Sequence, residues 1–335
     1  MTHDVTFTCM GCEMRLLADG ADDRAIRAAR DLLDAVDARL SRFRPGSELA
    51  RLNADPRSTV PASPLLRAAV GAALWAAERT RGLVDPTLLG ALERQGYAGS
   101  LAAGPRVALP GALADAPPRA PASSRAGAGW RAVAIDNRAG TITRPPGLRL
   151  DTGGTTKGVA ADAAARLLDG ARRLVVDCGG DLRVVVARGM APFEVAVEHP
   201  LFGERAATLR VAGGGVATSG LARRLWRRPD GSPAHHLLDP ATGEPAWTGL
   251  ISATALAPTT LEAEALAKAA LLRGPAGARR VLARRGGALV HDDGAVERID
   301  PARRRGRLPV HDDGAVERID PAAGDGRALR AGVAA

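Results

Sequence analysis

The first strong hydrophobic pattern in the chain is helical and lies near its N-terminus. Its apolar positions recur at alternating spacings of three and four residues, and they are Ile26, Ala29, Leu33, Val36 and Leu40. This spacing places them on one face of an α-helix, which Asp22 or Asp23 can cap and which Pro45-Gly46 ends. A second amphipathic helix is predicted after Ser63, where apolar residues recur every four positions.

Later in the chain the pattern changes to short runs of apolar and β-branched residues, which are typical of strands. The runs are VTFTCMGCEMRLLA, RAVAID, TITR, GLRLD, RLVVDCGGDLRVVVA with a turn at its two glycines, PFEVAVEH, ATLRVAG and LISATALAP. Further helices are predicted from Gly158 or Val159, over about 260–272 and near 276–284. Strands and helices alternate irregularly, so the sequence predicts an α+β fold in which a mixed β-sheet core carries flanking helices.

Residues 1–297 are predicted to form a single domain. Within it, residues 100–128 are rich in Ala, Pro, Gly and Ser, and we expect a long, poorly ordered surface excursion there. Residues 298–335 are predicted to be a mobile tail. The segment VHDDGAVERIDPA occurs at 290–302 and again, letter for letter, at 310–322. The first copy can form a closing strand and turn at Asp293-Gly294, whereas the second has no evident partner and is interpreted as a tandem duplication.

Composition excludes several classes of protein. The formal charge is +9, but the arginines are scattered among acidic residues and aromatics are only 3%, so a nucleic-acid partner is not expected. Three cysteines make no disulfide framework, and Cys9 and Cys12 are interpreted as two small strand residues. No apolar run reaches 18 residues, so the chain is not expected to span a membrane. The absence of a signal peptide predicts a cytoplasmic protein, although an extracytoplasmic location stays open.

The most informative stretch is DTGGTTKG, Asp151 to Gly158. Its glycines allow the backbone to approach a ligand, and a helix beginning after them would direct free N–H groups at an anion. The chain has 46 Lys plus Arg but only two lysines, Lys157 and Lys268. A lysine kept in such an arginine-rich chain favours function over a solvated turn, because its point charge can follow a phosphate group through a reaction. Asp151 would repel phosphate, so we expect it to contact ring or ribose donors, or a metal.

Other segments combine glycine, small polar groups and fixed charge in the same way. They are SRFRPGSELARLN at 41–53, GLVDPTLLG at 82–90, VDCGGDLRV at 176–184, VATSG at 216–220 and HHLLDPATGEP at 235–245. Neighbouring side chains of a strand point to opposite faces, so His235 and His236 are expected to differ, with one facing a pocket and the other facing away.

Taken in this order, with Met10-Gly11 before them and an E-A-x-A helix after them, these motifs resemble those of the FAD:protein FMN transferases, the ApbE family. The resemblance covers about residues 8–295 and implies a two-lobed fold with FAD in a cleft and magnesium on its pyrophosphate. It also implies an acceptor flavoprotein, whose Thr or Ser hydroxyl attacks the phosphorus on the FMN side of FAD, while AMP leaves. Nothing in the sequence indicates an oligomeric state.

The resemblance also implies roles for individual residues. Those matching cofactor contacts are Met10, Phe43, Leu83, Val84, Asp85, Asp151, Gly153, Gly154, Thr155, Lys157, Gly180, Ser219 and His236. Phe43 matches the aromatic residue that stacks on the isoalloxazine, and His236 matches a histidine that is a candidate base for the incoming hydroxyl. Lys157, Lys268 and His236 are the predicted catalytic residues. Thr156, through its carbonyl, and Glu264 match metal ligands.

One position departs from the family pattern. The metal helix usually reads D-A-x-x-T, whereas this chain has Glu264 and then Lys268 at the threonine position. A protonated lysine cannot coordinate magnesium. Our hypothesis is that the Lys268 ammonium occupies or crowds the metal site and contacts the FAD pyrophosphate directly, held by Glu264; the alternative is an ordinary Glu–Lys pair on a helix surface. Three outcomes stay open: an FMN transferase with reduced magnesium dependence, an FAD-binding protein with weak or no transfer, and an ordinary magnesium enzyme with shifted ligands. An FAD pyrophosphatase is a further functional alternative.

Overall fold

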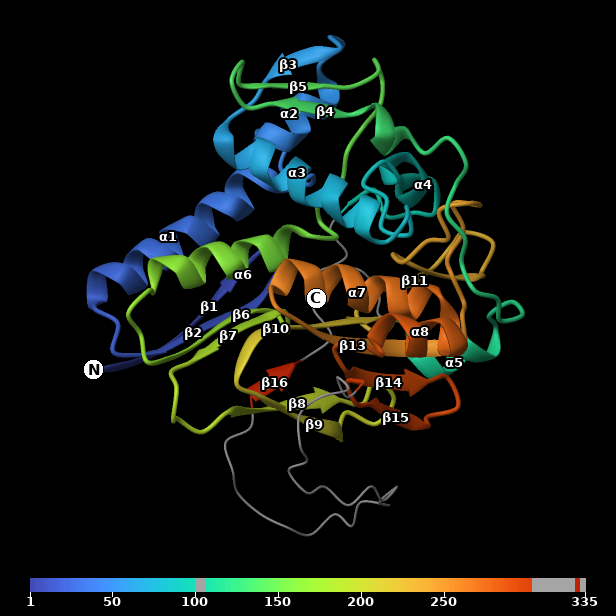
Figure 1. The fold of residues 1–335 in the computed structure, drawn as a ribbon. Coiled ribbons are helices and arrows are strands. Elements are labelled where there is room, and N and C mark those ends of the chain that lie inside the picture. Colours follow the sequence, from blue (N-terminus) through green and yellow to red (C-terminus); the bar gives the residue numbers. More distant parts are fainter. Residues whose placement is uncertain (100–106, 303–328, 332–335) are drawn as a thin grey trace.

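The computed structural model describes residues 1–99, 107–302 and 329–331. Its centre is a sheet of eight strands in the order β1-β2-β6-β7-β10-β13-β14-β15 (Figure 1). The strands are β1 (Thr2–Cys9), β2 (Cys12–Asp19), β6 (Arg173–Cys178), β7 (Leu182–Val186), β10 (Gly213–Gly220), β13 (Leu250–Ala257), β14 (Gly287–His291) and β15 (Val296–Ile299). The predicted α+β class is confirmed, and so are the strand pair joined at Gly179-Gly180 and the closing hairpin at Asp293-Gly294.

The pairing within this sheet differs from the mixed sheet that we expected. Every neighbouring pair of its strands is antiparallel. For β1–β2, β6–β7 and β14–β15 the cause is that the two strands are joined by a turn of only a few residues, and short turns permit only antiparallel pairing. Met10 and Gly11, both at positive φ (50° and 71°), form the first of these turns.

Four helices are α1 (Asp23–Leu40), α6 (Thr156–Leu167), α7 (Thr260–Leu272) and α8 (Gly274–Leu282). In Figure 1, α1, α6 and α7 lie along one face of the sheet. The five apolar residues predicted to share a face of α1 are all buried, and Asp22 caps the helix by accepting a hydrogen bond from the Ala25 N–H at 2.7 Å. The spacing of three and four residues therefore identified the buried side of this helix correctly.

Smaller sheets complete the fold. They are β3 (Thr59–Pro61) with β5 (Thr141–Thr143) and β4 (Ala134–Asp136), β11 (Leu225–Arg227) with β12 (Pro233–His235), and β16 (Leu329–Ala331) with β8 (Phe193–Glu198) and β9 (Arg205–Val211). The remaining helices are α2 (Glu48–Ala54), α3 (Pro64–Arg79), α4 (Leu89–Arg94), α5 (Leu109–Ala114) and the 3-10 turn η2 (Gly129–Ala132). Strand β16 pairs in parallel with β8, so this part of the predicted tail joins the fold. The second copy of the duplicated segment lies outside the described residues.

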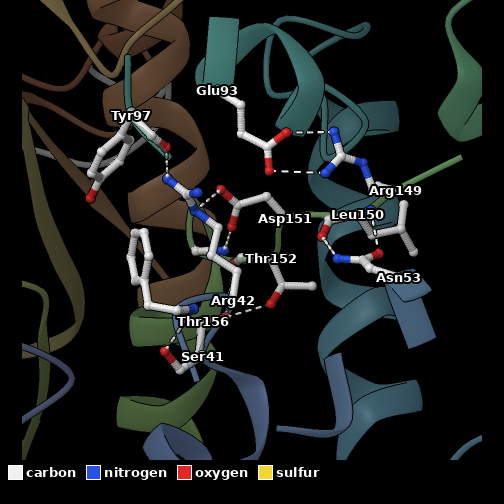
Figure 2. Close-up of polar contacts among 12 residues, drawn as sticks. Ser41, Arg42, Asn53, Glu93, Tyr97, Arg149, Leu150, Asp151, Thr152 and Thr156 are labelled. Atoms are coloured by element: carbon white, nitrogen blue, oxygen red, sulfur yellow. Dashed lines mark hydrogen bonds and ion pairs between the residues drawn. The ribbon is translucent and has the colours of Figure 1, made fainter. Parts of the chain in front are cut away.

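Two further expectations were wrong. Residues 107–128 are not poorly ordered, because they contain α5 and their backbone N–H groups donate to neighbouring carbonyls, as Ala120 does to Trp247 and Ala122 to Leu272. GLRLD is not a strand. The side chain of Asn53 binds both backbone groups of Leu150, each at 2.8 Å, and thereby takes the place of a strand ladder (Figure 2).

Helices α6 and α7 cap one another. The carboxylate of Asp162 on α6 accepts hydrogen bonds from Thr260 N (2.9 Å) and Leu261 N (3.0 Å) at the start of α7. Glu264 on α7 in turn accepts one from Gly158 N, in the first turn of α6, at 2.9 Å. The helices approach so closely that a Cβ on Gly158 would lie 2.8 Å from Leu261, so glycine is required there. This contact fixes the relative position of the two helices that carry Lys157 and Lys268.

Candidate active site

A cavity of about 1020 Å³ lies between the two main hydrophobic clusters of the protein. This volume is at the upper end of the range typical of small-molecule sites. All the predicted catalytic, cofactor-binding and metal-binding residues except Gly180 line it: Met10, Phe43, Leu83, Val84, Asp85, Asp151, Gly153, Gly154, Thr155, Thr156, Lys157, Ser219, His236, Glu264 and Lys268. Segments from nearly the whole length of the described chain therefore converge on one cavity.

Gly180 does not belong to the lining of the cavity. It lies in the β6–β7 turn at φ +98°, where its N–H donates to Asp177 Oδ1 at 2.7 Å. The next residue, Asp181, lines the cavity instead. The motif that contains Gly180 thus reaches the site through its carboxylate, and the glycine supplies the turn that a residue with a Cβ would adopt only with strain.

The DTGGTTKG loop leads directly into α6, which begins at Thr156 and not at Gly158 or Val159. Thr156 Oγ1 donates to the Thr152 carbonyl at 2.8 Å and holds the loop against the helix. Because Gly158 N already donates to Glu264, the first turn of α6 is not left with all its N–H groups free for an anion, as we had expected. Fixed cations are therefore the main attraction for an anion at this end of the cavity.

Lys157 is one of these cations. Its side chain is buried, and its Nζ lies 3.2 Å from Asp181 Oδ2. Burial alone would lower the pKa of Lys157, but the carboxylates of Asp181 and Glu264 outweigh that effect and raise it above its ordinary value. Lys157 is therefore a permanently charged group in the cavity wall.

Lys268 is the second. Its Nζ donates to Glu264 Oε1 at 2.9 Å, and the two side chains are only 15% and 1% exposed. Burial raises the pKa of Glu264, while the ammonium groups of Lys268 and Lys157 act against that rise. Glu264 therefore holds Lys268 as an i, i+4 pair, and the burial of both side chains distinguishes this pair from an ordinary one on a helix surface.

These residues do not fit a magnesium site of the usual kind. Magnesium requires several oxygen ligands in octahedral geometry. Glu264 Oε1 is occupied by Lys268 and Oε2 by Gly158 N–H, and Asp181 is paired with Lys157. Within the described part of the chain, no group of three or more His, Cys, Asp or Glu side chains is placed to hold a metal ion. A divalent cation here would also face two ammonium groups.

The two histidines are oriented as the sequence predicts. His235 is fully buried, with its ring edge against Trp247 (centroids 4.6 Å apart), whereas His236 lines the cavity. Burial and, next, the charge of Arg224 lower the pKa of His236 well below 6.5. Its Nδ1 is buried without a hydrogen-bond partner among the described residues. His236 is therefore a neutral imidazole at physiological pH, as a proton acceptor must be.

An aromatic group forms another part of the cavity wall, and of its residues the sequence motifs include only Phe43. The ring of Phe43 lies 5.5 Å from that of Tyr97, which lies 5.4 Å from that of Trp226. The guanidinium of Arg42 lies against Phe43 and Tyr97, at 4.1 and 4.4 Å from their ring centroids. Tyr97 and Trp226 stand outside the quoted motifs, so only their position in the fold reveals them.

Arg42 also explains Asp151, whose role was left open. Its guanidinium lies 3.3 Å from Asp151 Oδ2 and donates to the Tyr97 carbonyl at 2.8 Å (Figure 2). Asp151 Oδ1 accepts from Gly153 N at 2.8 Å. Asp151 thus joins the arginine to the glycine loop. The carboxylate of Asp85, unlike that of Asp151, is only partly satisfied within the protein. Its Oδ1 accepts hydrogen bonds from Thr87. Its buried Oδ2 has no partner among the described residues and can accept a hydrogen bond from a ligand.

The Cys9–Cys12 pair brackets the turn that places Met10 in the cavity wall. Both cysteines are free and buried. Burial raises the pKa of Cys9 to about 12 and also raises the pKa of Cys12. Because the thiolate is the reactive form, these are structural residues, as predicted.

The fold matches that of proteins of known structure. The ApbE protein of Thermotoga maritima superposes with a TM-score of 0.74 at 26% identity, over 90% of this chain and 97% of that one. The FAD:protein FMN transferase of Klebsiella pneumoniae is 32% identical over 300 residues, covering 83% of this chain and 80% of its own, and that of Salmonella typhimurium is 33% identical over 76% and 72%.

The ApbE family profile matches residues 6–290, and the chain belongs to the ApbE family. The predicted family is thereby confirmed. None of the helices in the described residues has the length and apolar character needed to cross a bilayer.

Proposed function

We propose that the protein transfers FMN from FAD to a Thr or Ser hydroxyl of an acceptor flavoprotein and releases AMP. The observation that carries this proposal is the convergence on one cavity of the aromatic Phe43, the cations Lys157 and Lys268, and the neutral His236. Membership of the ApbE family and the names of the Klebsiella and Salmonella relatives support it.

The aromatic part of the cavity wall suits the isoalloxazine ring, which would stack on Phe43. The part of the cavity where the start of α6 faces α7 suits the pyrophosphate, because the ammonium groups of Lys157 and Lys268 lie there. Asp85 Oδ2 is proposed to accept a hydrogen bond from an FAD donor, since a buried carboxylate oxygen without a partner is costly in the absence of ligand.

In the reaction, the acceptor hydroxyl oxygen forms a bond to the phosphorus of the FMN half, and the bond from that phosphorus to the bridging oxygen breaks. The hydroxyl proton passes to His236, and the bridging oxygen leaves with AMP. The lysines stabilise negative charge on the phosphate oxygens, so positioning and electrostatics supply most of the rate enhancement. No step of this reaction involves magnesium, because the residues at the predicted magnesium position do not fit that ion.

The test is to incubate the protein with FAD and a threonine-containing flavinylation-site peptide, then measure AMP and the mass of the peptide. Transfer predicts AMP release with a matching gain of FMN mass on the peptide. AMP with free FMN and an unchanged peptide indicates an FAD pyrophosphatase instead. Bound FAD with no AMP indicates a flavin-binding protein, and either result rejects the proposal. The peptide with threonine replaced by valine is the matched control, because it keeps the shape and lacks the nucleophile.

A further inference from the structure

We propose that the Lys268 ammonium takes the place of the divalent cation and contacts the FAD pyrophosphate directly, so that FAD binding and FMN transfer need no metal ion. This inference rests on the proposed use of FAD as substrate. The family resemblance predicts a magnesium ion, and the inference follows because Glu264 and Lys268 of α7, where α7 faces the start of α6, do not fit that ion.

Lys268 is built into the cavity and is not a surface residue. A Cβ placed on Gly154 would lie 3.5 Å from Lys268 Cε, so the lysine stem passes along the DTGGTTKG loop. The chain offers a direct contrast in Arg30 and Asp34 on α1, which have the same i, i+4 spacing but are 52% and 54% exposed and 3.9 Å apart. Exposed ion pairs of that kind contribute little to the stability of a protein, whereas the pair of Lys268 and Glu264 is shielded from water.

The hydrogen bonds of Glu264 leave it unsuited to bind a metal. One oxygen fixes Lys268 and the other caps α6. A magnesium ion would have to break one of these contacts and then bind beside an ammonium group. The same carboxylate instead orients that ammonium, so Glu264 is a positioning residue.

Lys268 retains capacity for a ligand. An ammonium has three N–H donors, and among the described residues only Glu264 is seen to accept one of them. Two N–H groups remain for phosphate oxygens. Lys157 is balanced by Asp181 and Lys268 by Glu264, so the four groups together are neutral without substrate. The negative charge of a pyrophosphate would therefore meet two fixed cations, and the carboxylate partner of one of them, Glu264, also accepts a hydrogen bond from Gly158 N.

The experiment measures the dissociation constant of FAD by calorimetry, and AMP release with the peptide, each with EDTA and with magnesium chloride. We expect wild-type values to be the same in both. Lys268→Met should weaken FAD binding at least about tenfold in either condition, because a charged contact is lost. Lys268→Thr restores a hydroxyl ligand, and its FAD affinity should become dependent on magnesium.

Lys268→Met leaves a buried carboxylate unpaired, so Lys268→Met with Glu264→Gln is measured beside it. Glutamine keeps an oxygen for Gly158 N, and circular dichroism reports whether the fold persists. The matched control is Arg79→Met, which removes the 3.3 Å ion pair to Glu262 on α7 outside the cavity and should leave FAD affinity unchanged.

Wild-type binding or transfer that is abolished by EDTA and restored by magnesium overturns the inference. FAD affinity in a folded Lys268 double variant equal to that of the wild type also overturns it. The FAD affinities are read without the peptide. If they behave as expected while no peptide gains mass, the proposed transferase activity fails and the role of Lys268 in FAD binding stands.

Discussion

Replacing Asp162 tests the reciprocal capping of α6 and α7. Its carboxylate is the acceptor for two backbone N–H groups at the start of α7, at 2.9 and 3.0 Å, and its side chain is only 13% exposed. Hydrogen bonds to charged groups contribute about 1.5–3 kcal/mol each, but Thr260 and Leu261 regain part of that through water in the variant. We therefore expect Asp162→Ala to lower the free energy of unfolding by about 3 kcal/mol, and Asp162→Asn by about 1 kcal/mol because an acceptor oxygen remains.

The measurement is urea unfolding, monitored by circular dichroism and by fluorescence. The variants can be compared if both probes give the same transition and if the dependence of the unfolding free energy on urea concentration is unchanged. Asp22→Ala is the matched control, since Asp22 caps α1 through a single exposed hydrogen bond and its loss should cost about 1 kcal/mol. A cost for Asp162→Ala no greater than that of the control would refute the reasoning. It would mean that the two helices are held together by packing and that their carboxylate caps are incidental.

Other predictions concern pH and the aromatic part of the cavity wall. Burial raises the pKa of Asp177 from 3.8 to about 7, so the folded protein keeps a proton that the unfolded chain loses between these values, and stability falls as pH rises through them. Asp177→Asn should therefore raise the free energy of unfolding by up to about 4 kcal/mol at pH 8 and leave it unchanged at pH 4. An equal gain at both pH values would show that the raised pKa of Asp177 is not its cause. Because the pKa of His236 is lowered well below 6.5, kcat/KM should show no acidic limb near pH 6.5, and such a limb would place an unshifted histidine in the reaction. Arg42→Met removes the contacts of the guanidinium with the rings of Phe43 and Tyr97 and with Asp151. The dissociation constant of FAD, measured by titration of flavin fluorescence, should therefore rise by about tenfold. An unchanged dissociation constant would show that Arg42 is not needed to hold Phe43 in place.

The sequence predicts most strongly those features that arise within one element. The apolar spacing of α1 gave its buried face, and the alternation of a strand separated His235 from His236. These predictions succeed because side-chain direction follows from local backbone geometry. The order of short motifs along the chain identified the family, although none of them alone was specific.

Features that depend on partners from distant segments were not predictable. Nothing near residue 150 shows that Asn53, 97 residues away, satisfies the backbone of Leu150 and prevents a strand. In the same way, Glu264 was interpreted as a metal ligand from its motif, and only the fold reveals that it caps α6. The aromatic neighbours of Phe43 were missed because they lie in segments without a recognisable motif.

Tyr97 gives this cavity an unusual experimental property. It is the only tyrosine in the chain, and it lies in the cavity wall between Arg42 and Trp226. Protein grown with fluorotyrosine would therefore contain one fluorine label, placed beside the expected position of the flavin. A single ¹⁹F resonance could then report occupancy, ring stacking and exchange in solution without any mutation, and the same signal would distinguish an empty cavity from one that holds only AMP.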